Sequence, residues 1–306
     1  MMFDITGKRF WFFLISGVVI LAGIISMATF GRLSAGIEFS SGSLMTVDFE
    51  QVVEQAQLKQ ELASSGYPNA IVQRTGEGTF FIRTRELSGN EKTVLEDALM
   101  ARFGQLTETE FNSVSPMVAT ETARNAAFAV VAAAIGILFY ITWAFRRMPK
   151  PFHYGACGVI ALLHDVLVVL GVFSIISSVL KWEINLMFIT GVLAVIGYSI
   201  NNTVVVFDRI RENLLRGVSS SFEVVVNNSL VEAIARSLNT SFTTLIVATA
   251  LLLFVGASIQ NFAVVLIIGI IAGTYSSICI APLLLVVWEK GEWGRFVPRL
   301  PFRGKS

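Results

Sequence analysis

Apolar residues in this chain are collected into long runs that shorter polar segments separate. Six runs of about 20 residues occur near positions 10–30, 124–145, 152–176, 185–207, 238–257 and 262–288. A helix needs about 20 consecutive apolar residues to cross the hydrocarbon core of a bilayer. The pattern therefore predicts six membrane-spanning helices, with one long polar segment between the first and the second.

The polar segment, residues 31–123, shows the periodicities of a small α+β domain. Strands are predicted at 44–49, 71–74, 79–84 and 107–114, helices at 51–64 and 91–103, and a hairpin turn at Gly76, Glu77 and Gly78. The βαββαβ order is that of the split βαβ, ferredoxin-like arrangement. The segment has no histidine, no cysteine, no phosphate-binding loop and no carboxylates at catalytic spacing. We therefore expect a binding or mechanical module and not an enzyme.

Composition agrees with a polytopic α-helical membrane protein. Charged residues make up 15% of the chain and hydrophobic residues 54%, whereas a soluble domain has roughly 25% charged residues. The net charge of +1 gives no sign of a nucleic-acid partner. We expect four regions: the N-terminus and first helix at 1–30, the α+β domain at 31–123, five helices at 124–288 and a basic tail at 289–306.

Lysine and arginine are concentrated in alternate connections between the runs. One set of connections contains Lys8, Arg9, Arg146, Arg147, Lys150, Arg209, Arg211, Arg216, Lys290, Arg295, Arg299, Arg303 and Lys305. The other set has Lys181 at 177–184 and no basic residue at 256–261. Basic residues in short loops are retained in the cytoplasm. We therefore expect both termini in the cytoplasm and residues 31–123 on the outside.

The first apolar run follows Lys8 and Arg9, as the apolar core of a signal peptide would. From Phe10 to Phe30 it is longer than the roughly 7–15 residues of such a core, so we expect a retained helix. Both cysteines, Cys157 and Cys279, fall inside predicted membrane helices and do not indicate a disulfide framework.

Two ionisable residues, His164 and Asp165, interrupt the third apolar run. Counted from Phe152, they lie roughly 18–20 Å deep in a core about 30 Å thick. An aspartate at such depth costs about 2.5–3.5 kcal/mol on insertion scales. A structural, mutually hydrogen-bonded pair and an ion relay both fit, and histidine titrates near physiological pH, as proton handling requires.

Two consecutive amides, Asn201 and Asn202, occur in the fourth run. Asn202 lies about 9 Å inside the boundary that the charged residues from Asp208 onward mark. We expect both amides on one side of the helix, on a stripe that faces protein. The stripe continues through Tyr198, Val195 and Gly191. Residue chemistry alone favours amides that join neighbouring helices.

The connection at 209–235 is amphipathic and is expected to lie along the interface or to pack under the bundle. Arg236 then opens the fifth span. An arginine that snorkels to the interface is the default interpretation, but a polar stripe of Asn239 or Thr240, Thr243 and Thr244 follows it at helical spacing and indicates a face that avoids lipid.

Small residues predict close helix packing in the last spans. They are Gly197 in the fourth run and the series Gly269, Gly273 and Ser277 in the sixth.

The segment 197–213, GYSINNTVVVFDRIREN, closely resembles the fourth transmembrane segment of bacterial SecF proteins, the smaller half of the SecD/SecF accessory factor of the Sec translocase. Similar matches occur at His164-Asp165, at Arg236 before its Thr/Ser-rich helix, in GIIAGTYSSICIAPLLL of the sixth run and, loosely, in GIEFSSGS at 36–43. One position departs from the family pattern, because the family's aspartate is Asn202 here.

The resemblance implies six helices of the resistance-nodulation-division type that pair with six of SecD in a bacterial inner membrane. It also implies that an ion gradient, of H⁺ or Na⁺, drives preprotein export from the SecYEG channel without a cofactor. The residues that it marks for ion coupling are His164, Asp165, Asn202, Arg236 and Asp208.

Two alternatives stay open. One is half of a small-molecule exporter of the same superfamily, which the small α+β domain disfavours. The other is a passive assembly factor of the translocase that uses no ion.

Overall fold

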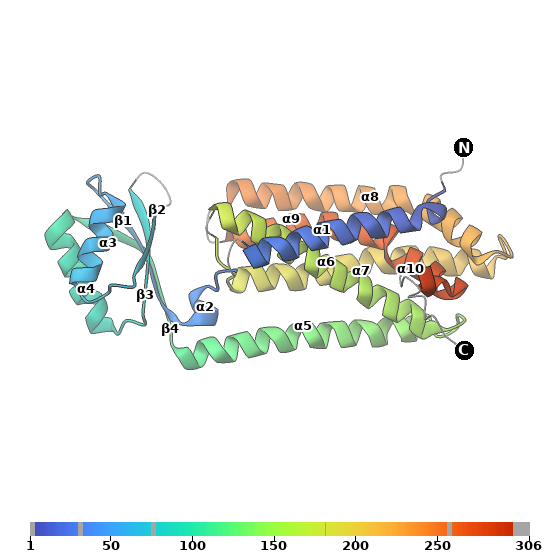
Figure 1. The fold of residues 1–306 in the computed structure, drawn as a ribbon, viewed down its shortest axis with the longest axis horizontal. Coiled ribbons are helices and arrows are strands. Elements are labelled where there is room, and N and C mark those ends of the chain that lie inside the picture. The colour runs from blue at the N-terminus through green and yellow to red at the C-terminus, as the bar shows by residue number, and fades with distance from the viewer. Residues whose placement is uncertain (1–3, 30–32, 75–77, 181, 256–258, 296–306) are drawn as a thin grey trace, which may run out of the picture. The chain divides into compact units, whose positions relative to one another are not determined.

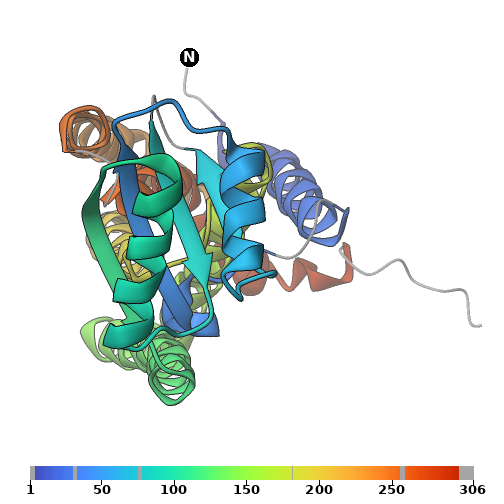
Figure 2. The ribbon, with the colours of Figure 1, turned by 90° about the vertical axis from the view of Figure 1, so that its left-hand side faces the viewer.

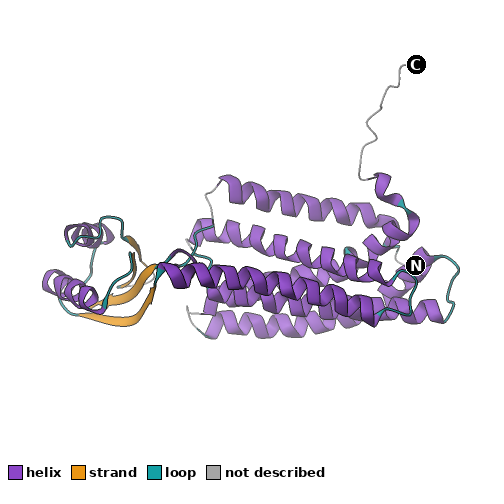
Figure 3. Ribbon diagram, turned by 90° about the horizontal axis from the view of Figure 1, so that it is seen from below, coloured by secondary structure: helices purple, strands orange, loops and turns teal. Residues whose placement is uncertain are grey.

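The computed structural model describes residues 4–29, 33–74, 78–180, 182–255 and 259–295. The chain divides into two compact units (Figure 1). Ser34–Phe128 form an α+β unit, and Met1–Leu33 with Ala129–Ser306 form a helical unit. Figure 3 shows that the strands of the described chain belong to the α+β unit.

The described part of the chain contains the six predicted membrane helices. Six helical segments in the described part of the chain are long and apolar enough to cross a membrane, which confirms the prediction. They are Thr6–Thr29, Pro116–Ala144, Pro151–Leu180, Leu186–Leu215, Phe222–Phe254 and Gln260–Lys290. The corresponding elements are η1 (Thr6–Lys8) with α1 (Arg9–Thr29), α5 (Pro116–Ala144), α6 (Pro151–Leu180), α7 (Leu186–Leu215), α8 (Phe222–Phe254), and α9 (Gln260–Cys279) with α10 (Ala281–Lys290).

The fourth and fifth spans extend well beyond their apolar runs. Helix α7 continues to Leu215 and α8 begins at Phe222, so the stretch 209–235 is not a separate interfacial segment. Val226 and Leu230 of α8 belong to the core of the bundle, and Val225 is buried as well. The part of the prediction that placed this stretch under the bundle is therefore correct, and its apolar face is explained by packing against the other helices.

The sixth span is broken near its end. Helix α9 ends at Cys279, Ile280 has φ −117° and ψ −66°, and α10 begins at Ala281. Pro282 lies in the first turn of α10, where the missing N–H of proline leaves no hydrogen bond unmade. The sequence predicted a single helix here.

The start of α1 is fixed by a buried arginine. Arg9 is 5% exposed. Its guanidinium donates to the carboxylates of Glu223 and Glu292, each at 2.6 Å, and to the carbonyl of Thr6 at 2.8 Å. Arg9 therefore joins α1 to the start of α8 and to the short helix η3 (Glu292–Arg295), a role that its place in a basic loop did not predict.

The α+β unit has the predicted βαββαβ order. After a short helix α2 (Ile37–Ser40), the elements are β1 (Gly42–Phe49), α3 (Gln55–Ser64), β2 (Ile71–Arg74), β3 (Thr79–Thr84), α4 (Gly89–Phe103) and β4 (Leu106–Val114). The strands form one antiparallel sheet in the order β2-β3-β1-β4. Gly76 and Glu77 of the predicted hairpin turn lie outside the described residues.

Both long helices of this unit, α3 and α4, cover the same face of the sheet (Figure 2). Alternate residues of the strands point toward them, and leucines at four-residue spacing on each helix meet them. The resulting core contains Met45, Val47, Phe49, Phe80, Ile82, Leu58, Leu62, Leu95 and Leu99. Phe49 contacts Phe80 and Phe103 edge-on, with ring centroids 5.9 and 5.7 Å apart.

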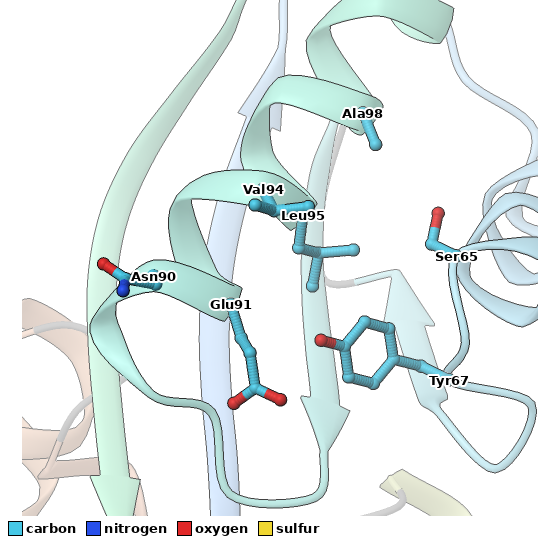
Figure 4. Close-up of a pocket in the computed structure, with 7 residues that line it drawn as sticks. All are labelled: Ser65, Tyr67, Asn90, Glu91, Val94, Leu95 and Ala98. Atoms are coloured by element: carbon cyan, nitrogen blue, oxygen red, sulfur yellow. The ribbon is translucent and has the colours of Figure 1, made fainter.

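A capping box begins α4. The Ser88 hydroxyl accepts from the Glu91 amide, and the Glu91 carboxylate accepts from the Ser88 amide at 2.9 Å. Figure 4 shows Glu91 and Leu95 on one side and Tyr67 and Ser65 on the other. These residues line a pocket of about 380 Å³. The carboxylate is also paired with Arg85 at 2.6 Å.

Candidate functional site

His164 and Asp165 lie on α6 in the interior of the helical unit, 8% and 1% exposed. The Nδ1 atom of His164 is 2.9 Å from Oδ1 of Asp165. Both residues face the other helices because α6 is buried on this side by α1, α7 and α9, which run alongside it (Figure 1). The structure thus brings the two sequence-predicted residues together as a hydrogen-bonded pair.

The second carboxylate oxygen of Asp165 is held by two serines from two other helices. Ser199 of α7 donates to Oδ2 at 2.5 Å, and Ser276 of α9 donates to the same atom at 2.8 Å. Both serines are fully buried. Hydroxyl donors stabilise a buried carboxylate that would otherwise pay its full desolvation cost.

The other side of His164 faces α1 and α9. Its Nε2 atom is 3.0 Å from the hydroxyl of Ser16. The ring of Tyr275 stacks on the imidazole with centroids 6.0 Å apart. Ser16 donates to the Tyr275 hydroxyl at 3.4 Å, and Tyr275 donates to the carbonyl of Phe12 at 2.8 Å.

We call these side chains the His–Asp cluster. Its members are Ser16, His164, Asp165, Ser199, Tyr275 and Ser276. They come from four helices, so the cluster exists only when the bundle is assembled.

Glycines allow the helices to approach closely enough to form the cluster. A Cβ on Gly23 of α1 would lie 2.6 Å from the Cα of Gly171 on α6. Ser26 and Ser174, one turn further along, share a hydrogen bond of 3.1 Å. This crossing places α1 against α6 and so brings Ser16 to His164.

The seam between α7 and α9 uses two glycines that the sequence predicted. A Cβ on Gly269 would lie 2.0 Å from Val195, and one on Gly273 would lie 2.9 Å from Ser199. Ser277 is buried, and its hydroxyl donates to the carbonyl of Thr274 on its own helix.

Gly197 does not belong to this seam, so its predicted packing role is wrong within this chain. The residue is exposed. A Cβ at Gly197 would meet no described atom within 4 Å.

Asn202 is 2% exposed and lies in a second, neighbouring group of polar side chains. Its amide donates to the Ser241 hydroxyl of α8 at 3.3 Å. Tyr198 and Thr274 donate to the same oxygen at 2.9 and 2.6 Å. Asn201, in contrast, is exposed, so the prediction that both amides share one face is wrong. Consecutive residues on a helix are about 100° apart, which separates the two side chains.

Arg236 and Asp208 lie apart from both groups. Within the described part of the chain, the Arg236 side chain is exposed and has no hydrogen bond or ion pair. Asp208 pairs with Arg211 at 2.6 Å, and its side chain is 55% exposed. The structure therefore does not bring these two candidates to His164, Asp165 or Asn202.

The polar stripe on α8 also faces outward in the single chain. The exposed residues include Asn239, Thr240 and Thr243, whereas the buried face contains Ser237, Ser241 and Ala248.

Sequence reasoning missed four members of the His–Asp cluster: Ser16, Ser199, Tyr275 and Ser276. The signal available was weak, because single hydroxyls inside apolar runs are common and also serve ordinary helix packing. Ser199 is three residues before Asn202, and Ser276 is three residues after the predicted Gly273, so helical spacing from known candidates would have found both.

The chemistry of the cluster suits proton binding, since it combines an imidazole, a carboxylate and hydroxyls in a continuous chain of hydrogen bonds. In the described ranges, no three histidine, cysteine or acidic side chains are grouped so that they could hold a metal ion.

Residues 94–291 match the family model described as protein export membrane protein SecD/SecF, C-terminal. The chain is 43% identical to the protein translocase subunit SecF of Thermobaculum terrenum, over 97% of this chain and 98% of that protein. It is 34% identical to the subunit SecDF of Bacillus subtilis, over 94% of this chain and 38% of that protein.

A solved structure shows the same architecture. The crystal structure of SecDF from Thermus thermophilus superposes with a TM-score of 0.82 at 29% identity, covering 95% of this chain and 39% of that one. The chain thus spans nearly the full length of the SecF protein and about two fifths of each SecDF protein. These matches establish that the chain belongs to the SecD/SecF family of protein export membrane proteins.

Proposed function

We propose that this chain is the SecF-type subunit of a Sec protein translocase and that it uses proton movement through the His–Asp cluster to drive preprotein export. The main observation that supports this proposal is the His164–Asp165 pair, which is buried at a junction of four helices. Ionisable groups are costly inside a membrane and are found there where they carry ions or protons. The role involves no covalent chemistry and no cofactor.

A SecD-type subunit is the proposed partner. In the SecDF relatives, the segment that matches this chain is part of a much longer chain, which supports a partner that supplies the remainder. The exposed polar residues Arg236, Asn239 and Thr240 on α8 support it as well, because such side chains are unfavourable against lipid. The partner would cover this face.

The proposed location is the bacterial inner membrane, with both termini in the cytoplasm and the α+β unit outside. The distribution of basic residues supports this orientation. Lys181 and the tail residues Arg299, Arg303 and Lys305, which contribute to that argument, lie outside the described residues. The further proposed partners are the SecYEG channel and the preprotein. Membrane lipid would surround the helices.

One proton per cycle does not supply enough free energy for a complete conformational switch. Moving one charge across 100 mV provides about 2.3 kcal/mol. Changing a two-state equilibrium from 1:99 to 99:1 takes about 5.5 kcal/mol. The cycle therefore uses more than one proton, or a pH gradient in addition to the potential.

The test uses the chain copurified with its SecD-type partner and reconstituted with the channel. Asp165→Asn keeps the shape and can still accept from Ser199 and Ser276, but it cannot exchange a proton. We expect the complex to assemble and gradient-driven export to fall at least a hundredfold, because positioned proton-transfer groups contribute about 10²–10⁴-fold. The control is Asp97→Asn on the exposed surface of α4.

Three outcomes would decide against parts of the proposal. Unchanged export with Asp165→Asn would favour a passive assembly factor. Export driven by a sodium gradient and not by a proton gradient would identify Na⁺ as the coupling ion. Failure to copurify any SecD-type subunit would remove the proposed partner.

A further inference from the structure

We propose that Ser16 and Tyr275 form a proton relay between the His164–Asp165 pair and the N-terminal end of α1, and that the pair holds one exchangeable proton in this structure. The relay rests on the proposed proton coupling, but the second part of the inference, the proton held by the pair, concerns only where the hydrogens lie.

The hydrogen-bond directions begin at Tyr275. Its hydroxyl hydrogen is used in the bond to the Phe12 carbonyl, at 2.8 Å. Its oxygen is therefore an acceptor for Ser16, whose hydroxyl donates to it at 3.4 Å. A serine hydroxyl has a single hydrogen. The 3.0 Å contact between Ser16 and His164 must then be donated by the imidazole, which places a hydrogen on Nε2.

The contacts of the Asp165 carboxylate determine where the remaining hydrogen lies. Oδ2 of Asp165 accepts from Ser199 and Ser276. Oδ1 faces Nδ1 of His164 at 2.9 Å, and one hydrogen must lie between these atoms for the contact to be favourable. With Nε2 also protonated, the pair is either imidazolium with carboxylate or imidazole with carboxylic acid. Both forms have a net charge of zero.

Loss of the shared proton would leave a net negative charge in the bundle. The groups that neighbouring helices place against the pair are Ser16 from α1, Ser199 from α7, and Tyr275 and Ser276 from α9. Among these described neighbours, Tyr275 is the one titratable side chain, and none is a cation. The neutral, protonated pair is therefore the form that suits the closed bundle of this structure.

The relay step is a balanced shift of hydrogens. The Nε2–H bond of His164 breaks as an O–H bond forms on Ser16, whose own hydrogen passes to the Tyr275 oxygen. Tyr275 releases its hydrogen to a water molecule at the N-terminal end of α1, and Nδ1 takes the shared hydrogen from Asp165. The pair becomes imidazole with carboxylate, the water becomes hydronium, and Ser16 now donates to Nε2.

The geometry gives the relay a direction. Phe12 precedes Ser16 by four residues, one helical turn of about 6 Å toward the N-terminus. The chain from His164 through Ser16 to Tyr275 therefore runs toward the end of α1 that the proposed orientation places at the cytoplasm. The Gly23–Gly171 crossing holds Ser16 in reach of the imidazole.

Nitrogen NMR tests the protonation state without any export assay. The chain has two histidines, so ¹⁵N-histidine labelling of the full chain in its complex gives two sets of ring signals, and His153→Gln assigns them. We expect Nε2 of His164 to carry a hydrogen at neutral pH. An unprotonated Nε2 beside a protonated Nδ1 would overturn the proposal, because Ser16 would then donate to the imidazole.

Export measurements test the relay itself. Ser16→Ala and Tyr275→Phe each remove one hydroxyl of the chain. The matched controls are Ser26→Ala, which removes a buried hydroxyl from the same helix face, and Tyr154→Phe, which removes one from a buried ring stacked on Phe145. We expect each relay variant to lower proton-driven export about tenfold or more. A positioned proton-transfer group usually contributes about 10²–10⁴-fold.

A solvent deuterium isotope effect separates proton transfer from structural damage. It should rise in Ser16→Ala and Tyr275→Phe, where proton transfer becomes limiting, and stay at the wild-type value in the controls. If Asp165→Asn lowers export but the relay variants show the same export and isotope effect as their controls, the relay is overturned and the proposed function stands. If Asp165→Asn has no effect on export, the proposed function fails, and the NMR result alone decides the proton positions.

Discussion

Gly273 of α9 lies directly against Ser199 of α7: a Cβ added to the glycine would come within 2.9 Å of the serine Cβ and 3.1 Å of its hydroxyl. The same hydroxyl donates to Asp165 at 2.5 Å. A tight contact of the helix seam and the buried carboxylate of Asp165 therefore share one residue, Ser199. A change in the spacing of α7 and α9 acts on the candidate site without touching an ionisable group.

This contact predicts opposite effects for two glycine-to-alanine substitutions. Alanine favours a helix over glycine by about 1 kcal/mol, so Gly197→Ala, which meets open space, should be neutral or stabilising. Gly273→Ala gains the same term but must displace Ser199, and overpacking typically costs 1–3 kcal/mol, so we expect it to be about 1–2 kcal/mol less stable than Gly197→Ala. Denaturant unfolding of the isolated chain in detergent measures the difference. Equal stabilities would show that the seam yields without strain.

The glycine contacts between helices also show which features can be predicted from the sequence. Gly269 and Gly273 were visible because their spacing of four residues lies on one helix. The contact of Gly23 with Gly171 joins residues 148 positions apart on two helices, and no periodicity within either helix identifies the partner. Spans and strand order follow from local patterns, whereas contacts between spans do not.

The candidate site divides in the same way. His164 and Asp165 were conspicuous because charge is rare in an apolar run. The serines that complete their hydrogen bonds were not, because a hydroxyl changes the hydropathy of a run only slightly. Asn201 and Asn202 are neighbours in sequence, yet one is exposed and the other is bonded to Ser241. Only the positions of the surrounding helices decide between them.

Acid should loosen the start of α4. Arg85, followed by the amide and hydroxyl of Ser88, lowers the pKa of Glu91 from its ordinary 4.5 to about 2. A carboxyl whose pKa is lower in the folded state stabilises that state above its unfolded pKa, and loses the contribution as pH falls through the folded value. We therefore expect the first-turn amides of α4 to exchange faster as pH falls from about 4.5 toward 2, in hydrogen-exchange measurements corrected for intrinsic rates.

Glu91→Gln supplies the comparison for this pH effect. The variant cannot ionise, so it should show the faster exchange already at neutral pH and little further change in acid. Asp97→Asn, an exposed substitution on the same helix, should keep the wild-type profile. If wild type and Glu91→Gln exchange alike at neutral pH, the charge of Glu91 and its pair with Arg85 do not hold the helix start.

Cysteine labelling should place the α+β unit and the connection between α7 and α8 on opposite sides of the membrane. The native thiols at 157 and 279 are buried, so single cysteines at exposed positions report on their own sites. We expect Asn90→Cys to react with an impermeant maleimide added to the outside of spheroplasts, and Ser220→Cys only after the membrane is opened. Labelling of both from the same side would contradict the six-span orientation.

The last prediction concerns Asn202, where the family resemblance leads one to expect an aspartate. The amide is 2% exposed and donates to the Ser241 oxygen, which also accepts from Tyr198 and Thr274. An ionised aspartate cannot donate, and among the described residues no cation contacts this group. We therefore expect Asn202→Asp to lower the stability of the chain by about 1–3 kcal/mol, the usual cost of a buried polar group left without its partner. Proton-driven export should be equal to the wild type or lower, because the exchangeable proton resides at His164 and Asp165.

Asn201→Asp makes the same change at the exposed neighbour and should leave stability nearly unchanged. A large gain of export with Asn202→Asp would instead show that the amide is an impairing substitution and would move the coupling site to this position on α7.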